Sequence, residues 1–217
     1  MKLYSYWRSS SSYRVRIALA IKGIDAEIVP VHLLRDGGQQ HSADFFAINP
    51  LRQIPALEID IAGRRHVITQ SLAIIELIDE LFPEPPLLPT TPAGRAHARQ
   101  LAEIVCAGIQ PLQNLDVLTR LDALGVDRRS WGQDVIARGL AALEATAAPL
   151  AGTFLIGDEV SVADVVLIPQ LYNARRFHID VSELPLLARV EAACLALPAF
   201  VTAHPDNQPD AEVSQAR

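Results

Sequence analysis

The chain contains little cysteine and no excess of basic residues. Two of its 217 residues are cysteines, Cys106 and Cys194, which are too few for a disulfide framework and fit a reducing cytoplasm. Its 19 lysines and arginines are outnumbered by 25 aspartates and glutamates, so the formal net charge is −6. Because proteins that bind nucleic acid need a surplus of positive charge, we expect no nucleic-acid partner.

Long apolar runs are also lacking. No stretch reaches the roughly 18 consecutive apolar residues of a transmembrane helix, and the N-terminal residues contain no long apolar segment of a signal peptide. We therefore expect no membrane association and a cytoplasmic location. The six histidines show no metal-ligand spacing with one another or with the cysteines, so we expect no bound metal.

The chain does have enough apolar residues for a sizeable core, since 50% of its residues are hydrophobic and only 20% are charged. Its clearest boundary is the segment 83–92, in which five of ten residues are proline. Neither a helix nor a central strand tolerates that many prolines, so the segment predicts an extended linker. We expect one domain over residues 1–82 and a second over 93–217.

Short strand and helix signals alternate in the first domain. The predicted strands are 3–6, 27–31, 56–61 and 64–68, and the predicted helices are 15–21, 42–47 and 71–82. Serines 9–12 are N-cap candidates for the first helix, and Gly23 suits its C-terminal end. This order of elements is typical of a thioredoxin-like α/β layer.

The second domain lacks strong strand signals and has helical periodicity throughout. The predicted helices are 93–120 with a kink at Pro111, 131–148, 161–177 and 184–197. The third of these opens with a capping box that ends at Asp164, which we interpret as a helix cap. We expect an all-α domain whose polar end, after His204, is poorly ordered.

Three motifs have both a structural and a functional interpretation. Spacing alone favours Arg8 to Ser12 as a serine-rich N-cap, but a helix N-terminus also stabilises an anion or a thiolate. Pro55 either begins a strand or is a cis-proline, which would leave the backbone of Ile54 to pair with an extended ligand. Gln70 and Ser71 form either a plain helix cap or a carboxylate site.

Other polar residues have simpler interpretations. Arg14 and Arg16 are expected as surface or structural charges on the first helix. Composition alone favours a solvated pair for Arg175 and Arg176. Both cysteines are expected to be buried small hydrophobes.

Together, these motifs resemble those of one known protein family. The segment 3–25, LYSYWRSSSSYRVRIALAIKGID, resembles the N-terminal signature of zeta-class glutathione transferases. Further similar segments are 38–40, 49–50, 53–55, 70–76, 108–115, 157–160, 163–164 and 173–177. The resemblance covers nearly the whole chain and implies the glutathione transferase fold, with a thioredoxin-like N-terminal domain, an all-α C-terminal domain and a homodimeric assembly.

The resemblance also implies an activity. Zeta-class enzymes include glutathione-dependent cis–trans isomerases of dicarboxylates, so we expect conversion of maleylacetoacetate to fumarylacetoacetate in tyrosine and phenylalanine catabolism. The alternatives are a maleylpyruvate isomerase of gentisate degradation, a general glutathione transferase and a non-catalytic glutathione-binding protein. The family motif usually reads Ser-Ser-Cys-Ser, and Ser11 stands at the cysteine position. Related maleylpyruvate isomerases lack that cysteine too, and glutathione's own thiol remains as the nucleophile.

Residue roles follow from the same resemblance. Arg8, Ser9, Ser10 and Arg176 are implied as catalytic, with the serines favouring the thiolate and the arginines binding carboxylates. Glutathione is implied to bind in a cleft between the two domains. The residues implied to hold it are Ser9, Ser10, Ser11, Gln40, Ile54, Gln70, Ser71, Gln110 and Asn114.

Overall fold

The computed structural model describes residues 1–212, and its contacts divide the chain into two compact units. Of the described residues, the first unit contains 1–85 together with 198–212, and the second contains 86–197. The sequence predicted instead that all residues after 92 belong to the helical domain. The structure differs because the chain's end packs with its beginning.

The first unit is built on a four-stranded sheet with the strand order β2-β1-β3-β4. The central strand β1 (Lys2–Ser5) pairs in parallel with β2 (Glu27–Pro30) and antiparallel with β3 (Ala56–Ile61). The strand β4 (Arg64–Thr69) completes a hairpin with β3. A β-α-β unit followed by a hairpin is the arrangement that the sequence predicted for the thioredoxin-like layer.

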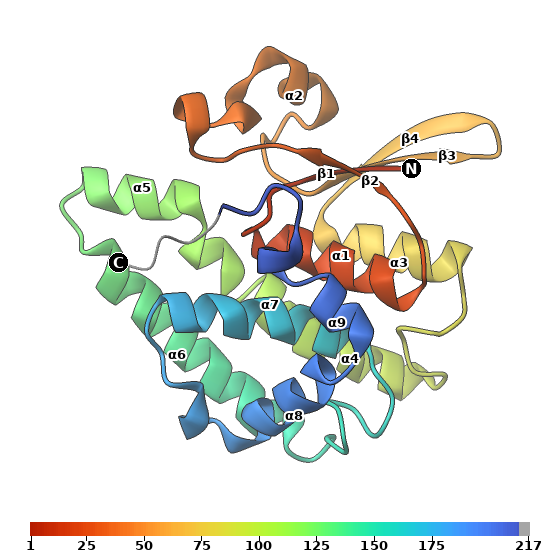
Figure 1. The fold of residues 1–217 in the computed structure, drawn as a ribbon. Coiled ribbons are helices and arrows are strands. Elements are labelled where there is room, and N and C mark those ends of the chain that lie inside the picture. Colours follow the sequence, from red (N-terminus) through yellow and green to blue (C-terminus); the bar gives the residue numbers. More distant parts are fainter. Residues whose placement is uncertain (213–217) are drawn as a thin grey trace. The chain divides into compact units, whose positions relative to one another are not determined.

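Helices flank this sheet on both sides, and α1 and α3 lie together along one of them (Figure 1). The helices of this part are α1 (Ser10–Ile21), α2 (Ala43–Ile48) and α3 (Ser71–Leu81). Because side chains alternate along a strand, Ser5 of β1 meets Arg16 of α1, whereas the ring of Tyr4 lies 6.1 Å from that of Phe45 in α2. Both faces of the central strand β1 are thus covered by helices.

The C-terminal segment returns to α1 and corrects the expectation of disorder after His204. It forms α9 (Pro198–Thr202) and a short 3₁₀ turn η5 (Pro205–Asn207), and α9 packs on α1. Tyr13 donates from its hydroxyl to the Phe200 carbonyl at 3.5 Å, and Arg16 donates to the Ala203 carbonyl at 3.2 Å. Farther along, the Trp7 N–H donates to the Asp210 carboxylate at 2.9 Å, and the chain is described as far as residue 212. Residues 213–217 of the predicted disordered stretch lie outside the described part.

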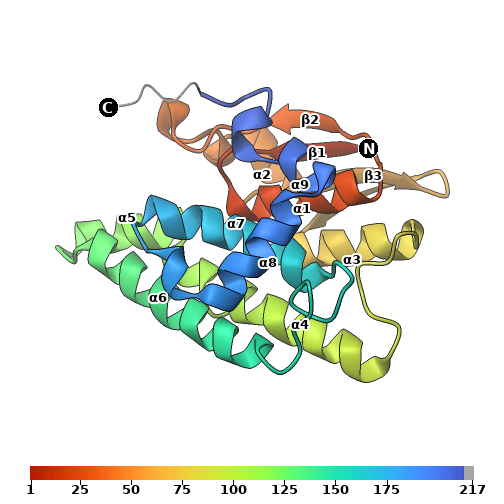
Figure 2. The ribbon, with the colours of Figure 1, turned by 60° about the horizontal axis from the view of Figure 1, so that its bottom comes forward.

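The second unit is helical, as predicted. Its elements are α4 (Pro92–Cys106), η3 (Gln110–Gln113), α5 (Leu115–Ala123), α6 (Arg128–Ala147), α7 (Val162–Arg176), η4 (Val181–Glu183) and α8 (Pro185–Leu195). Most of α7 is buried, and it packs against α4, α6 and α8 (Figure 2). A helix that is buried on nearly all sides lies in the centre of its bundle.

Local chemistry fixes where these helices begin and end. The predicted kink at Pro111 is instead a break, since α4 ends at Cys106 and a separate helix starts after Asn114, whose side chain accepts from the Asp116 N–H. The predicted capping box of α7 is confirmed at Ser161 and Asp164.

The proline-rich segment is not wholly a free linker. Leu87 and Leu88 within it are buried, and the Leu87 carbonyl accepts a hydrogen bond of 2.8 Å from the Val162 N–H. Its second half is therefore part of the helical unit.

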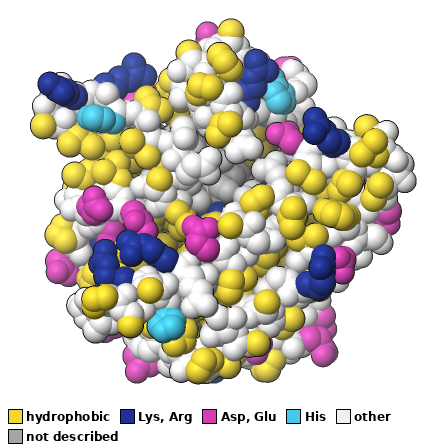
Figure 3. All heavy atoms as spheres, turned by 180° about the vertical axis from the view of Figure 1, so that it is seen from behind, with side chains coloured by type: hydrophobic (Ala, Val, Ile, Leu, Met, Phe, Trp, Pro, Cys, Tyr) yellow, Lys and Arg dark blue, Asp and Glu magenta, His cyan; other side chains and the backbone are white. Residues whose placement is uncertain are grey.

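Within residues 1–212, none of the helices combines the length and apolarity needed to cross a membrane. The same residues bring together no cluster of three or more histidine, cysteine or acidic side chains that could hold a metal. On the face shown in Figure 3, acidic and basic side chains are interspersed rather than separated by charge.

Candidate functional site

Ser9 occupies the turn between β1 and α1 and is the N-cap of that helix. Its backbone is extended, and its hydroxyl oxygen accepts from the Ser12 N–H at 3.2 Å. The Ser9 N–H donates to the Tyr6 carbonyl at 3.0 Å and closes the turn. The structural interpretation of the motif is therefore confirmed. Because the oxygen is the acceptor, the hydroxyl hydrogen can still serve as a donor to a ligand.

The same turn has the chemistry of an anion site. Ser9, Ser10 and Ser11 are half-buried, and the first turn of α1 contains no acidic side chain. The Arg8 guanidinium lies 5.2 Å from the centre of the Trp7 ring, which is within cation–π range. Hydroxyl groups, helix N–H groups and a guanidinium thus occur within a few residues, and all of them favour a negative charge.

Buried arginines hold this turn in place. Arg16, only 5% exposed, donates to the Ser5 hydroxyl at 3.2 Å and to the Trp7 carbonyl at 2.8 Å. Arg14 is 1% exposed. Of the two interpretations that the sequence left open for this pair, surface charge or structural charge, the structural one is correct.

Arg14 also connects α1 to the second predicted motif. Its guanidinium donates to the Ser71 hydroxyl at 3.1 Å in a buried contact. Ser71 is the first residue of α3, and the N-cap residue Gln70 has a φ of 70° and makes no side-chain cap bond. In the described part of the chain, the N–H groups at the start of α3 thus have no N-cap side chain as acceptor, and the Arg14 guanidinium contacts the first residue of the helix. This arrangement suits a carboxylate.

Ile54 offers backbone rather than side-chain groups. It is buried beside Pro55, and the peptide bond between them is cis, as expected for a thioredoxin-like layer. Within the described residues, the Ile54 N–H and C=O form no hydrogen bond. Buried backbone groups are normally paired, so these two are suited to the main chain of an extended ligand.

Gln40 presents a buried acceptor. Its amide nitrogen donates to the Leu33 carbonyl at 3.3 Å, whereas its Oε1 atom has no hydrogen-bond partner among the described residues. Gly38, with a φ of +97°, makes room for this amide, because a Cβ atom there would lie 2.6–2.9 Å from its atoms. An unpaired buried oxygen is costly and points to a donor on a ligand.

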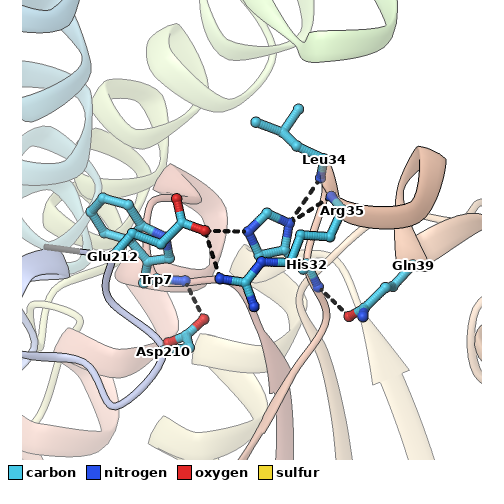
Figure 4. Close-up of polar contacts among 7 residues, drawn as sticks. All are labelled: Trp7, His32, Leu34, Arg35, Gln39, Asp210 and Glu212. Carbon is cyan, nitrogen blue, oxygen red and sulfur yellow. Dashed lines mark hydrogen bonds and ion pairs between the residues drawn. The ribbon is translucent and has the colours of Figure 1, made fainter. Parts of the chain in front are cut away.

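A polar cluster that the sequence did not predict joins Asp210 and Glu212 to the first unit's N-terminal part (Figure 4). Asp210 accepts from the Trp7 N–H at 2.9 Å. Glu212 accepts from His32 Nε2 at 3.0 Å and from the Arg35 guanidinium at 2.8 Å. We call these five residues the C-terminal clasp. Its members are up to 203 positions apart in sequence, so no local pattern could have indicated it.

His32 is the centre of the clasp, and its contacts define its tautomer. Its Nδ1 atom accepts from the N–H groups of Leu34 and Arg35 at 3.1 and 2.8 Å, so Nε2 carries the hydrogen and donates to Glu212. Hydrogen bonds from His32 and then Arg35 lower the pKa of the Glu212 carboxyl. The His32 N–H also donates to the Gln39 side chain at 2.9 Å, which connects the clasp to the segment carrying Gln40.

In the second unit, the neighbouring arginines Arg175 and Arg176 differ in their partners. Arg175 donates from two nitrogens to the two Glu191 carboxylate oxygens, each at 2.5 Å. Arg176 is exposed at the end of α7 and donates to the Asn173 side-chain oxygen at 3.2 Å. Both arginines are exposed, as expected for a solvated pair, and Arg175 in addition forms an ion pair with the buried Glu191 carboxylate.

The predicted site residues fall into two sets, one in each unit. The first unit contains Arg8, Ser9, Ser10, Ser11, Gln40, Ile54, Gln70 and Ser71, and the second contains Gln110, Asn114 and Arg176. Their roles, and the cleft expected between the domains, stay predictions.

The remaining candidates are structural. Burial, with Asp164 and Glu191 nearby, raises the pKa of the Cys194 thiol far above its usual range, so this thiol is not a nucleophile. Cys106 is half-buried in α4. Asp164 is fully buried and accepts from the Leu155 and Ser161 N–H groups at 2.8 Å, which confirms its role as a cap.

Known proteins share this sequence and fold. Residues 1–80 match the glutathione S-transferase N-terminal domain, and residues 96–198 match the C-terminal domain. The maleylacetoacetate isomerase of Rattus norvegicus is 50% identical over 208 residues, which are 96% of this chain and 94% of that protein.

Solved structures extend the similarity. The maleylacetoacetate isomerase of Anaeromyxobacter dehalogenans 2CP-1, with GSH bound in its active site, is 50% identical over 97% of each chain, with a TM-score of 0.89. A maleyl pyruvate isomerase, a bacterial zeta-class enzyme, is 41% identical over 98% of this chain and 100% of its own, with a TM-score of 0.91. Together with the predicted fold, which the structure confirms, these matches show that the chain belongs to the glutathione S-transferase family, in its zeta class.

Proposed function

We propose that this protein is a glutathione-dependent isomerase that converts maleylacetoacetate to fumarylacetoacetate in tyrosine and phenylalanine catabolism. The observation that carries the proposal is the segment from Arg8 to Ser11 at the start of α1, in a chain 50% identical to a maleylacetoacetate isomerase over 96% of its length. Hydroxyl and amide donors at a helix N-terminus suit a thiolate, and the adjacent guanidinium suits a carboxylate.

The polar groups of the first unit fit glutathione, a tripeptide with a thiol and two terminal carboxylates. The start of α3, where Arg14 lies behind Ser71, suits the γ-glutamyl carboxylate. The backbone of Ile54 suits the cysteinyl main chain, and the unpaired Gln40 oxygen suits an N–H group at the glycyl end. We assign Gln70, Gln110 and Asn114 to the same ligand.

Two tasks fall to the protein's own residues. Bound glutathione would supply a thiol nucleophile that adds reversibly to the conjugated cis double bond and so permits rotation about it. A free thiol has a pKa of about 8.5, so Ser9, Ser10 and Ser11 must favour the sulfur anion near neutral pH. Arg8 and Arg176 bind the substrate carboxylates and offset the negative charge that develops in the transition state.

The test is an absorbance assay of maleylacetoacetate and maleylpyruvate with and without glutathione. We expect both to be isomerised only when glutathione is present, with the higher kcat/KM for maleylacetoacetate. If calorimetry shows glutathione binding but neither substrate turns over, the protein is a non-catalytic glutathione binder and the proposal is wrong.

Maleylpyruvate is the alternative substrate, and two observations favour keeping it in the assay. A serine, Ser11, occupies the motif position where most zeta-class enzymes have cysteine. The maleyl pyruvate isomerase described above shares 41% identity and the fold over the whole of its length. A higher kcat/KM for maleylpyruvate would move the protein to gentisate degradation. Assays of glutathione conjugation would measure any general transferase activity.

We also infer that the protein is a cytoplasmic homodimer. The inference of a dimer rests on the zeta-class resemblance, and that of the compartment on two cysteines that form no disulfide. Light scattering at micromolar concentration should give twice the 23.6 kDa of one chain. A mass of one chain would contradict the dimer.

A further inference from the structure

Arg176 lies at the exposed end of a row of hydrogen-bonded side chains, and the other three members of the row are amides. Gln170, Asn173 and Arg176 follow one another at intervals of three residues and so share one side of α7. The fourth member, Gln113, is the last residue of η3. The bonds run from Arg176 to Asn173 at 3.2 Å, from Asn173 to Gln113 at 2.6 Å and from Gln113 to Gln170 at 3.0 Å. We call these four residues the amide relay.

The guanidinium determines the direction of every bond in the amide relay. Arginine has donors and no acceptor, so Asn173 must turn its oxygen toward Arg176. Its nitrogen then faces the Gln113 oxygen, and the Gln113 nitrogen faces the Gln170 oxygen. The Gln170 nitrogen is left buried and without a partner among the described residues. One orientation of the arginine is thus coupled to one orientation of each amide.

Burial makes this coupling rigid. Gln170 is 0% exposed, and Asn173 and Gln113 are 6% and 7% exposed, so water cannot easily replace their bonds. The neighbouring Arg175 is held differently, by the Glu191 carboxylate. Asn173 has no charge, so its contact orients Arg176 without neutralising it. A guanidinium that must bind an anion needs this kind of support.

We propose that Asn173 and Gln113 are positioning residues that orient Arg176 for a substrate carboxylate. Gln113 lies on the same segment as Gln110 and Asn114, which we assigned to glutathione, so the amide relay also fixes Arg176 relative to that segment. This inference rests on the proposed role of Arg176 in substrate binding. What is new is that the buried amides of the helical unit determine the orientation of Arg176.

The test is a double-mutant cycle of Asn173→Ala and Arg176→Ala. Asn173→Ala should raise the substrate KM about 10-fold, the equivalent of one hydrogen bond to a charged group, and leave the glutathione KM unchanged. The double variant should be no worse than Arg176→Ala alone, because Asn173 acts through Arg176. The dissociation constant of malonate, a dicarboxylate that does not react, should follow the same pattern in calorimetry.

Two further variants separate positioning from folding. Gln113→Glu keeps an oxygen for the Asn173 amide, and Gln170 can turn its unpaired nitrogen toward the new carboxylate, so the substrate KM should stay near normal. Gln113→Leu should raise it. Arg175→Ala removes the same charge from the adjacent residue and should lower the melting temperature without changing the KM or the malonate affinity. Gln113 lies outside α7, so its variants also test the proposal if Asn173→Ala fails to fold.

Several outcomes would overturn the inference. Additive effects of Asn173→Ala and Arg176→Ala, or equal effects of Gln113→Glu and Gln113→Leu, would mean that the amides serve only the fold. An Arg176→Ala variant with normal malonate affinity would remove the role of Arg176 and this inference together. An absence of turnover in the unmodified protein would instead contradict the proposed isomerase, and malonate binding would still decide the role of the amide relay.

Discussion

Ser9 has two roles that separate experimentally, because one belongs to the fold and the other to the reaction. Ser9→Ala removes the acceptor of the Ser12 N–H, which should cost about 1 kcal/mol of stability. It also removes a donor to the thiolate, so the pH–rate profile should move to higher pH and the rate should fall by a factor on the order of 10²–10³. Steady-state kinetics between about pH 6 and pH 9, roughly the range in which thiols and histidines titrate, would measure the shift of the pH profile and the fall in rate. Urea unfolding would measure the loss of stability.

The matched control for this change is Ser12→Ala. The Ser12 hydroxyl is buried and has no hydrogen-bond partner in the described part of the chain, so its loss should leave activity near normal. Equal loss of activity in both variants would mean that Ser9 acts through the helix rather than through the thiolate.

Gly38 is a second residue whose role can be isolated. A Cβ atom at this position would lie 2.6 Å from the Gln40 amide nitrogen, so Gly38→Ala should displace that amide. The loss of one ligand hydrogen bond should raise the glutathione KM roughly 3–10-fold. Gly37→Ala is the control, because Gly37 has a φ of +77° and open space around it. Both variants should lose similar stability, about 1 kcal/mol or more, from the positive φ alone. A raised glutathione KM in Gly37→Ala would contradict the role of Gln40.

At the scale of an element, the capping box of α7 makes stability depend on pH. Burial raises the pKa of Asp164 from 3.8 to about 6, and hydrogen bonds from Leu155 and Ser161 oppose this shift. Between pH 3.8 and about pH 6, the Asp164 carboxyl is therefore protonated more in the folded state than in the unfolded state. As pH rises from 4 to 6, the carboxyl should remove about 3 kcal/mol of stability. Above about pH 6, which is close to the pKa of Asp164 in the folded state, this loss should stay constant.

The measurement compares urea unfolding of the unmodified protein and of Asp164→Asn from pH 4 to pH 8. Asparagine does not titrate, so the difference in unfolding free energy should change by about 3 kcal/mol below pH 6 and remain level above it. A carbon-13 titration of the Asp164 carboxyl provides the second readout if the variant does not fold. A midpoint below 4 would contradict the prediction.

At the scale of the whole molecule, the C-terminal clasp makes the first unit discontinuous in sequence. Asp210→Ala would leave the N–H of the buried Trp7 without its acceptor, which should cost about 2 kcal/mol and lower the melting temperature by about 4–8 °C. Glu212→Ala is the matched comparison. Glu212 is 47% exposed and binds both His32 and Arg35, and Arg35 is 63% exposed. Water therefore already reaches this contact, so the loss of stability should be smaller. Thermal unfolding followed by circular dichroism would rank the two variants, and the opposite order would contradict this account.

Local pattern predicted most of the elements of this fold. The period of the apolar residues located all four strands and the main helices, and proline, glycine and serine located their ends. Two predictions were wrong for different reasons. The predicted helix 93–120 is divided around Pro111, where the proline and the Asn114 cap act locally. The segment after His204 is ordered by long-range contacts, since Asp210 and Glu212 bind Trp7 and His32, and these contacts do not follow from residues adjacent in sequence.

The sequence by itself determined the family and the motifs, because an N-cap, a capping box and the Arg8–Ser12 segment depend on residues that are close together along the chain. Only the tertiary structure decided which arginines are buried, that Asp210 and Glu212 reach Trp7 and His32, and that Gln113 connects with Asn173. The physical reason is that a buried charge or amide must find a partner, and packing brings that partner from anywhere in the chain.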